Sequence, residues 1–133
     1  MAAFVLDTNT VIDYFKGRGK VAERLLTVAP REIALPAIAA YEVWVGVLGS
    51  QQARRRESQY EQFLSVIEVI PFDRAISRRT AEVRLALERR GASIGPLDTL
   101  IAGTALACSA TLVTRNTKEF GRITGLKVAN WHD

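Results

Sequence analysis

The sequence predicts an α/β fold: a single three-layer α/β/α domain over residues 1–133, with a central, mainly parallel sheet of about five strands. Two observations lead to this prediction. Short apolar runs alternate with longer segments of helical periodicity along the chain, and this pattern indicates a parallel sheet with helices on both faces. The length of 133 residues is typical of one domain.

The predicted strands are apolar runs bounded by turn-forming residues. The first run, "AAFVL", ends at the turn-forming "DTN", and the second, "EIALP", ends at Pro36. The later runs are "VIEVIPF", "TLVT" and "LKVAN". In order, the predicted strands cover residues 2–6, 32–36, 66–72, 111–114 and 126–130.

The segments between these runs carry helical spacing and helix boundary signals. In residues 37–49, apolar side chains recur at positions 38, 41, 45 and 48, and Gly49 ends the stripe. Asp73 is placed to cap the longest predicted helix, and Gly91 follows its end. Pro96 fits the first turn of the next helix. The predicted helices cover residues 9–16, 20–29, 37–49, 52–64, 73–91, 95–110 and 116–121.

Composition and charge exclude several classes of protein. The chain has 18 basic and 14 acidic side chains, and its net charge of +4 is compatible with a polyanionic partner without requiring one. The one cysteine, Cys108, cannot form an internal disulfide. Neither a secretion signal nor an apolar run of membrane-spanning length is present. We therefore expect a cytoplasmic protein that does not bind membranes.

Three carboxylates follow predicted strands, at the sheet edge where ligands of such folds bind. Asp7 ends the first strand, Glu42 lies in the helix after the second, and Asp98 lies in the first turn of the helix 95–110. A structural alternative is open for each: helix capping for Asp7, an arginine partner for Glu42, and the helix dipole for Asp98. Because clustered carboxylates repel one another without a cation between them, their convergence predicts a metal site.

The donors of this predicted site are all oxygen atoms. Cys108 lies in an apolar helical pattern and the only histidine, His132, lies near the end of the sequence. A hard cation, Mg²⁺ or Mn²⁺, is therefore favoured over Zn²⁺. Asn116 and Glu119 follow the fourth strand, where they also fit a capping box with Asn116 as the cap. Both roles are compatible, since a capping carboxylate can still face a cleft.

A carboxylate-bound Mg²⁺ suits phosphoryl chemistry, because the metal neutralises phosphate oxygens and lowers the pKa of a bound water. The sequence lacks a Walker phosphate loop and a GxGxxG turn, which disfavours nucleotide-binding folds. Two rival functions stay open. A phosphatase with an aspartyl nucleophile also places an aspartate after its first strand, although it usually has a second aspartate where this chain has Asn9. The other rival is a non-catalytic RNA-binding module with a degenerate site.

Four stretches give the chain a resemblance to a known family. They are "FVLDTNTVIDYF", "LPAIAAYEVWVGV", "IGPLDTLIAGTAL" and "LVTRNTKEFGRITGLKVANW". They resemble the ordered motifs of PIN-domain ribonucleases, and more closely those of the VapC toxins of bacterial toxin–antitoxin pairs. The resemblance spans almost the whole chain and implies a PIN-like fold and an Mg²⁺-dependent endoribonuclease, with Mn²⁺ as a substitute. The most similar subset cuts initiator tRNA in the anticodon stem-loop.

The resemblance also implies roles for the three carboxylates. Asp7 and Asp98 match direct Mg²⁺ ligands, and Glu42 matches the residue that completes the cluster and helps to position or activate the attacking water. The family reaction hydrolyses a phosphodiester bond and leaves 5′-phosphate and 3′-hydroxyl ends.

Three further residues after the fourth strand match the family motifs. Thr114 and Asn116 match positions that orient the site, and Glu119 matches an acid counted as catalytic in close relatives. Other members have an aspartate near Asn116. The resemblance therefore leaves open whether Glu119 or no side chain fills the fourth acidic position.

The predicted partners are RNA, an antitoxin and a second copy of the chain. Arg115 and Lys118 are the best candidates for RNA contacts because they flank the predicted site. The resemblance implies a VapB-like antitoxin, whose arginine or lysine would suit a negative pocket. Val43, Trp44 and Val47 add apolar surface to the helix 37–49 beyond one buried stripe, which predicts a groove or a homodimer surface unless the helix is buried on most sides.

Overall fold

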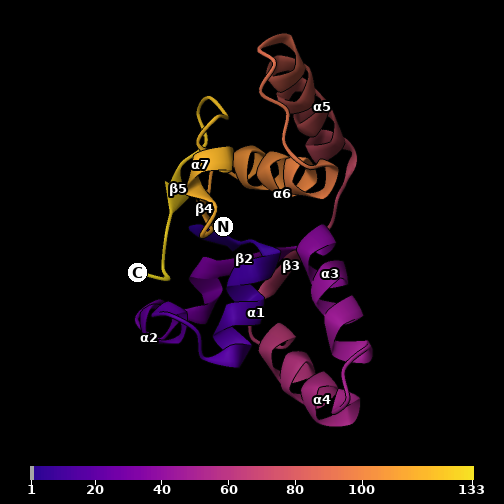
Figure 1. Ribbon diagram of the computed structural model, residues 1–133, viewed down its shortest axis with the longest axis vertical. Helices are drawn as coiled ribbons and strands as arrows, with labels where there is room; N and C mark the ends of the chain where they lie inside the picture. Colours follow the sequence, from indigo (N-terminus) through magenta and orange to yellow (C-terminus); the bar gives the residue numbers. More distant parts are fainter. Residues whose placement is uncertain (1) are drawn as a thin grey trace.

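The computed structural model describes residues 2–133, which contain the predicted parallel sheet of five strands (Figure 1). The strand order is β3–β2–β1–β4–β5, and every neighbouring pair is parallel. The strands are shorter than the apolar runs that predict them. They are β1 (Phe4–Leu6), β2 (Ile33–Pro36), β3 (Glu68–Ile70), β4 (Thr111–Val113) and β5 (Val128–Ala129).

The helices follow the predicted segments closely. They are α1 (Thr8–Lys16), α2 (Val21–Leu25), α3 (Ala37–Leu48), α4 (Ala53–Leu64), α5 (Arg74–Arg89), α6 (Pro96–Ala107) and α7 (Thr117–Phe120). Asp73 caps α5 as predicted, since its carboxylate accepts a hydrogen bond from the Ile76 amide at 2.9 Å. The main difference is α2, which ends at Leu25 and is followed by a short 3₁₀ helix at Pro30–Glu32.

The strand order places helices on both faces of the sheet. The chain proceeds from β1 outward to β3 and then returns to β4 on the other side of β1. Right-handed crossovers therefore put α1 to α4 on one face and α5 to α7 on the other. Figure 1 shows α1, α2 and α4 on one side of the strands and α6 and α7 on the opposite side. The order reverses between β1 and β4, and the carboxyl ends of strands at such a point line a crevice.

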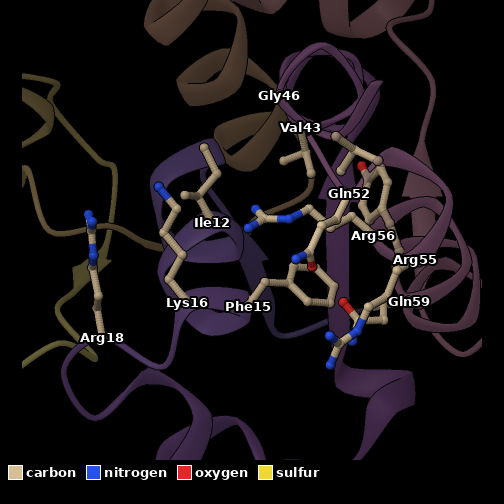
Figure 2. Close-up of a pocket in the computed structure, with 12 residues that line it drawn as sticks. Ile12, Phe15, Lys16, Arg18, Val43, Gly46, Gln52, Arg55, Arg56 and Gln59 are labelled. Carbon is tan, nitrogen blue, oxygen red and sulfur yellow. The ribbon is translucent and has the colours of Figure 1, made fainter. Parts of the chain in front are cut away.

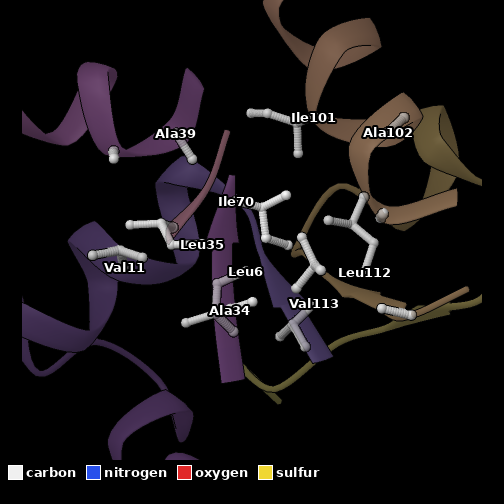
Figure 3. Packing of buried hydrophobic residues seen from close by; sticks show 14 of the residues in the cluster. Leu6, Val11, Ala34, Leu35, Ala39, Ile70, Ile101, Ala102, Leu112 and Val113 are labelled. Atoms are coloured by element: carbon white, nitrogen blue, oxygen red, sulfur yellow. The ribbon is translucent and has the colours of Figure 1, made fainter. Parts of the chain in front are cut away.

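The core lies on both faces of the two central strands. Val5, Leu6, Leu112 and Val113 are at most 1% exposed, and Figure 3 shows helical side chains closing over this layer, including Val11 of α1, Ala39 of α3 and Ile101 of α6. Burying each aliphatic side chain of this size stabilises the fold by about 1.5–3 kcal/mol. The core thereby fixes where the crevice between β1 and β4 opens. No helix within residues 2–133 is long and apolar enough to cross a membrane.

Candidate functional site

Asp7 lies at the carboxyl end of β1, beside the point where the strand order reverses. Its backbone amide donates to the Val113 carbonyl of β4 at 3.1 Å, and its side chain is 5% exposed. One carboxylate oxygen accepts the Thr10 amide at 2.9 Å, so Asp7 is also the N-cap of α1. The cap uses Oδ1, so Asp7 can cap α1 and still serve the site through its other carboxylate oxygen.

Glu42 projects from α3 toward the start of α1. The Thr8 hydroxyl donates to its Oε1 at 2.6 Å. The alternative in which Glu42 pairs with an arginine is wrong, because no ion pair to it forms within the described part of the chain. This half-buried carboxylate is held by a neutral donor that leaves its negative charge uncompensated.

Asp98 interacts electrostatically with the other acids of the predicted site. It lies in the first turn of α6, whose N-cap is Gly95. Burial raises the pKa of Asp98 above its usual value, and the neighbouring charges of Asp7, Glu42 and Glu119 raise it further. Asp7, Glu42 and Glu119, which come from three other segments of the chain, therefore each lie within Coulomb range of Asp98.

The predicted capping box at the start of α7 does not form. The Asn116 side chain makes no cap hydrogen bond; instead its amide donates to Glu119 Oε2 at 2.9 Å. The backbone explains this difference, because Asn116 has ψ 56° rather than the extended conformation of a capping residue. Thr114 is fully buried, and its hydroxyl oxygen accepts a hydrogen bond from the backbone N–H of Asn116, with 3.0 Å between nitrogen and oxygen. Thr114 thus shapes the turn that presents Asn116 and Glu119.

The donor chemistry fits a hard divalent cation, although the carboxylates do not form a closed cage. Within residues 2–133, no three acidic, histidine or cysteine side chains are close enough to hold a metal ion by themselves. Mg²⁺ rarely needs such a cage, since it usually takes one or two carboxylates and keeps several waters. That Asp7, Glu42 and Asp98 share one ion therefore stays a prediction.

Asp13 is a buried acid whose role the sequence analysis missed. Its carboxylate lies 3.1 Å from His132 Nδ1, 3.7 Å from Arg115 Nη1 and 3.8 Å from Arg18 Nη1. The sequence carried one signal that Asp13 has a partner. It lies in the second half of α1, where a negative charge interacts unfavourably with the helix dipole. Consequently Arg115 is partly neutralised by Asp13, whereas Lys118 makes no ion pair within the described residues.

A groove of about 640 Å³ lies between α1, α3 and α4 (Figure 2). Val43 and Val47 line it, which agrees with the groove interpretation of these residues. Trp44 instead packs against Tyr60, with their ring centroids 4.6 Å apart. Cationic side chains from α1 and α4 surround the opening, and we call this feature the basic groove.

The exposed apolar face of α3 differs from the one that the sequence suggested. Tyr41, Val45 and Leu48 are 58–59% exposed. These positions are spaced one turn apart on the helix and therefore share a face. Leu97, at the start of α6, is a further exposed apolar residue.

Comparisons with known proteins agree with this geometry. A family model described as "PIN domain" matches residues 4–126. The chain is 32% identical over 131 residues to the "tRNA(fMet)-specific endonuclease VapC" of Shigella flexneri, covering 98% of this chain and 99% of the relative. The structure is also similar to DNA-bound VapBC from Salmonella typhimurium, with TM-score 0.91, 33% identity, and coverage of 98% and 99%. For VapBC2 of Rickettsia felis bound to a promoter DNA fragment, the TM-score is 0.88 and the identity 36%, covering 96% and 98%. This chain therefore belongs to the PIN-domain family, and within it to the VapC ribonucleases.

Proposed function

We propose that the chain is an Mg²⁺-dependent endoribonuclease toxin that hydrolyses phosphodiester bonds in RNA. The observation that carries this proposal is the placement of the half-buried Asp98 within Coulomb range of three other carboxylates, those of Asp7, Glu42 and Glu119. A cluster of like charges at a crevice is costly unless a cation is bound there. Mg²⁺ supplies that charge, and when bound it stabilises negative charge on phosphate oxygens.

Each carboxylate has its own proposed role at this site. Asp7 and Asp98 are the proposed direct ligands of Mg²⁺, with water and substrate phosphate completing its shell. Glu42 faces the same site, and its hydrogen bond from Thr8 fixes the carboxylate so that it positions the attacking water. Glu119 is the proposed fourth acid. The side-chain amide of Asn116 is uncharged and orients Glu119 by donating a hydrogen bond to its carboxylate.

Initiator tRNA is the proposed substrate. Relatives from Shigella flexneri and Salmonella typhimurium that match over nearly their whole length are named tRNA(fMet)-specific endonucleases. Arg115 and Lys118 are exposed, and they are the sequence neighbours of Asn116 and Glu119. They are therefore the proposed contacts to phosphates near the bond that is cut.

A VapB-like antitoxin is the proposed regulator of the enzyme. Three of the similar solved structures are of VapBC. The acid cluster would accept an arginine or lysine of such a partner, which would occupy the place of the cation.

We also propose a homodimer, formed through the α3 face of Tyr41, Val45 and Leu48. Elution of the isolated chain as a monomer in size-exclusion chromatography would contradict the dimer.

The membership of the family favours this proposal over the rival functions. A phosphatase would form a covalent phosphate on Asp7, and trapping such an intermediate would support it. A degenerate binding module would bind RNA without cutting it, yet Asp7, Glu42 and Asp98 are all retained.

The test is the cleavage of purified initiator tRNA with Mg²⁺ or with chelator, for the parent chain and for Asp7→Asn and Asp98→Asn. Asparagine also caps helices well, so Asp7→Asn removes charge while keeping α1 capped. Asp73→Asn is the matched control, because Asp73 caps α5 outside the site. We expect cleavage to require Mg²⁺, to disappear in the two site variants and to persist in the control. Metal-independent cleavage would contradict the proposal.

A further inference from the structure

The face of α1 that carries Thr10 and Asp13 contacts the end of β4. These two residues are one helical turn apart, and both are buried. The Thr10 hydroxyl donates a hydrogen bond to the Val113 carbonyl at 3.0 Å. Two residues after Val113, the Arg115 side chain returns to α1, with its Nη1 atom 3.7 Å from Oδ2 of Asp13. Asp13 therefore draws the side chain that precedes Asn116 toward the helix that begins at the acid cluster.

A buried histidine fixes the Asp13 carboxylate. Nδ1 of His132 lies 3.1 Å from Oδ2 of Asp13, and the two side chains are 4% and 7% exposed. The Nε2 atom of His132 is buried and has no hydrogen-bond partner among the described residues. Because a carboxylate only accepts hydrogen bonds, these contacts assign the ring hydrogen to Nδ1 of a neutral imidazole. His132 thus holds the carboxylate in place and leaves its negative charge to act on Arg115.

His132 is a firm anchor because the residues around it are tied to α2 and to the turn before it (Figure 1). The backbone amide of Lys20 donates to the His132 carbonyl at 3.0 Å. The Arg24 guanidinium donates to the Asn130 carbonyl at 2.7 Å. The approach is so close that a Cβ atom on Gly19 would lie 2.6 Å from the His132 carbonyl oxygen. The imidazole is therefore part of the packed fold and can orient a neighbouring side chain.

We propose that Asp13, anchored by His132, is a positioning residue that holds Arg115 for contact with a phosphate of the RNA. This inference rests on the proposed function, because Arg115 takes part only by binding the substrate. Asp13 lies six residues after Asp7, which is about 9 Å along the helix axis at about 1.5 Å per residue. Arg115 is thereby held for a phosphate beside the scissile one, while the scissile phosphate lies at the acid cluster.

The geometry favours positioning of Arg115 over masking of its charge. The separation of 3.7 Å from Asp13 is longer than the about 2.7–3.2 Å of a hydrogen bond. The Arg115 side chain is 65% exposed and donates no hydrogen bond within residues 2–133. Arg18 lies 3.8 Å from the other carboxylate oxygen and shares the negative charge. Asp13 therefore restricts where Arg115 points without using the N–H donors that a phosphate needs.

A double-mutant cycle between Asp13 and Arg115 tests the proposal. Asp13→Asn removes the charge, and its side-chain oxygen still accepts a hydrogen bond from His132. We expect its KM for tRNA cleavage to rise about threefold at unchanged kcat, because a freed arginine must be ordered again on binding. Asp13→Asn combined with Arg115→Ala should match Arg115→Ala alone, since Asp13 acts only through Arg115. Independent, multiplied losses in the double variant, or a lower KM for Asp13→Asn, would overturn the proposal.

The exposed ion pair of Arg79 and Glu82 on α5 supplies the matched control. Its nitrogen and oxygen are 3.6 Å apart, close to the separation of Arg115 and Asp13. Glu82→Gln removes one negative charge, as Asp13→Asn does, so any general gain in attraction for RNA is common to both variants. We expect Glu82→Gln to leave KM unchanged or to lower it. A rise equal to that of Asp13→Asn would overturn the proposal.

Two replacements of His132 test the anchor. His132→Asn keeps a side-chain N–H donor near the position of Nδ1, whereas His132→Leu keeps apolar bulk and removes the donor. We expect the asparagine variant to retain the parent KM and the leucine variant to raise it about threefold, as Asp13→Asn does. Equal KM values for the two variants would remove His132 from the proposal and overturn it as stated.

Measurements without cleavage separate this proposal from the proposed function. The heteronuclear NOE of the Arg115 Nε–H group reports side-chain motion on the picosecond to nanosecond timescale. We expect it to fall in Asp13→Asn and to stay unchanged in Glu82→Gln. The same cycle can be measured as tRNA affinity in chelator. If it shows coupling while the parent never cuts tRNA, the positioning role stands and the nuclease assignment fails. If the parent cuts tRNA with Mg²⁺ while the cycle is additive, the positioning role fails and the nuclease assignment stands.

Discussion

Replacing Gly103 with alanine should destabilise the protein, although the same change usually strengthens a helix. Gly103 lies in α6 and faces Thr80 of α5. A Cβ atom at this position would lie 1.9 Å from Thr80 Oγ1, 2.6 Å from Thr80 Cβ and 2.8 Å from Thr80 Cα. The last of these is a backbone atom, so a change of rotamer at Thr80 does not relieve the overlap, and α5 must move away from α6.

The magnitude follows from two opposing terms. Overpacking of this kind costs about 1–3 kcal/mol, and the backbone overlap places Gly103→Ala at the upper end. Alanine regains up to about 1 kcal/mol of helix propensity, which leaves a net loss of about 2 kcal/mol. For 133 residues, an unfolding entropy of about 2.1 cal/mol/K per residue converts 1 kcal/mol into about 4 °C of Tm. We therefore expect Tm to fall by about 8 °C.

Thermal unfolding followed by circular dichroism measures this change, and Gly46→Ala is the matched control. Gly46 also lies inside a helix, but its Cβ position meets nothing within 4 Å. There the propensity term acts alone and should raise Tm by up to about 4 °C. Two identical substitutions should thus shift Tm in opposite directions. A Tm for Gly103→Ala at or above that of the parent would refute the close approach of α5 and α6.

Three further predictions concern the charged groups. Because the pKa of Asp98 is raised in the folded state, its neutral form favours folding at low pH, and this stability is lost as the pH rises through the raised pKa. Asp98→Asn without metal should therefore match the parent at acidic pH and melt higher at neutral pH; a sharply lower Tm would make Asp98 a structural residue. Asp13→Ala should cost about 1–3 kcal/mol in urea unfolding, because it leaves the buried His132 Nδ1 without its partner, whereas Arg18→Ala at the exposed end should cost less than about 1 kcal/mol. Arg115→Ala should weaken RNA binding and lower the salt slope by about 0.7, and an affinity unchanged at every salt concentration would exclude Arg115 from the RNA interface.

Periodicity and boundary residues were enough to predict the order of strands and helices. The three inner strands, β1, β2 and β4, are short apolar runs that are largely buried between helices, so composition alone marks them. Asp73 and Pro96 occupy the helix starts that local chemistry favours. The sequence also predicts that Asp7, Glu42 and Asp98 lie at one edge of the sheet, because parallel strands all end there. Asp7 and Glu42 lie within Coulomb range of Asp98, and the sharing of one metal ion by the three stays a prediction.

Contacts between side chains that are far apart along the chain could not be predicted from the sequence. Asp13 and His132 are separated by most of the chain, and neither carries a motif. The helix 37–49 is apolar almost all round, so periodicity could not tell that Val43 is buried whereas Val45 is exposed. The Asn116 side chain turns to Glu119 because of a local ψ angle that no residue type dictates.

The four carboxylates come from the end of β1, from α3, from the start of α6 and from α7. Asp7 and Glu119 are 112 positions apart in the sequence, so only the folded sheet and its helices bring these segments together. Local unfolding that detaches any one of the four segments would therefore disperse the cluster of negative charge, and its electrostatics and the fold would be lost together.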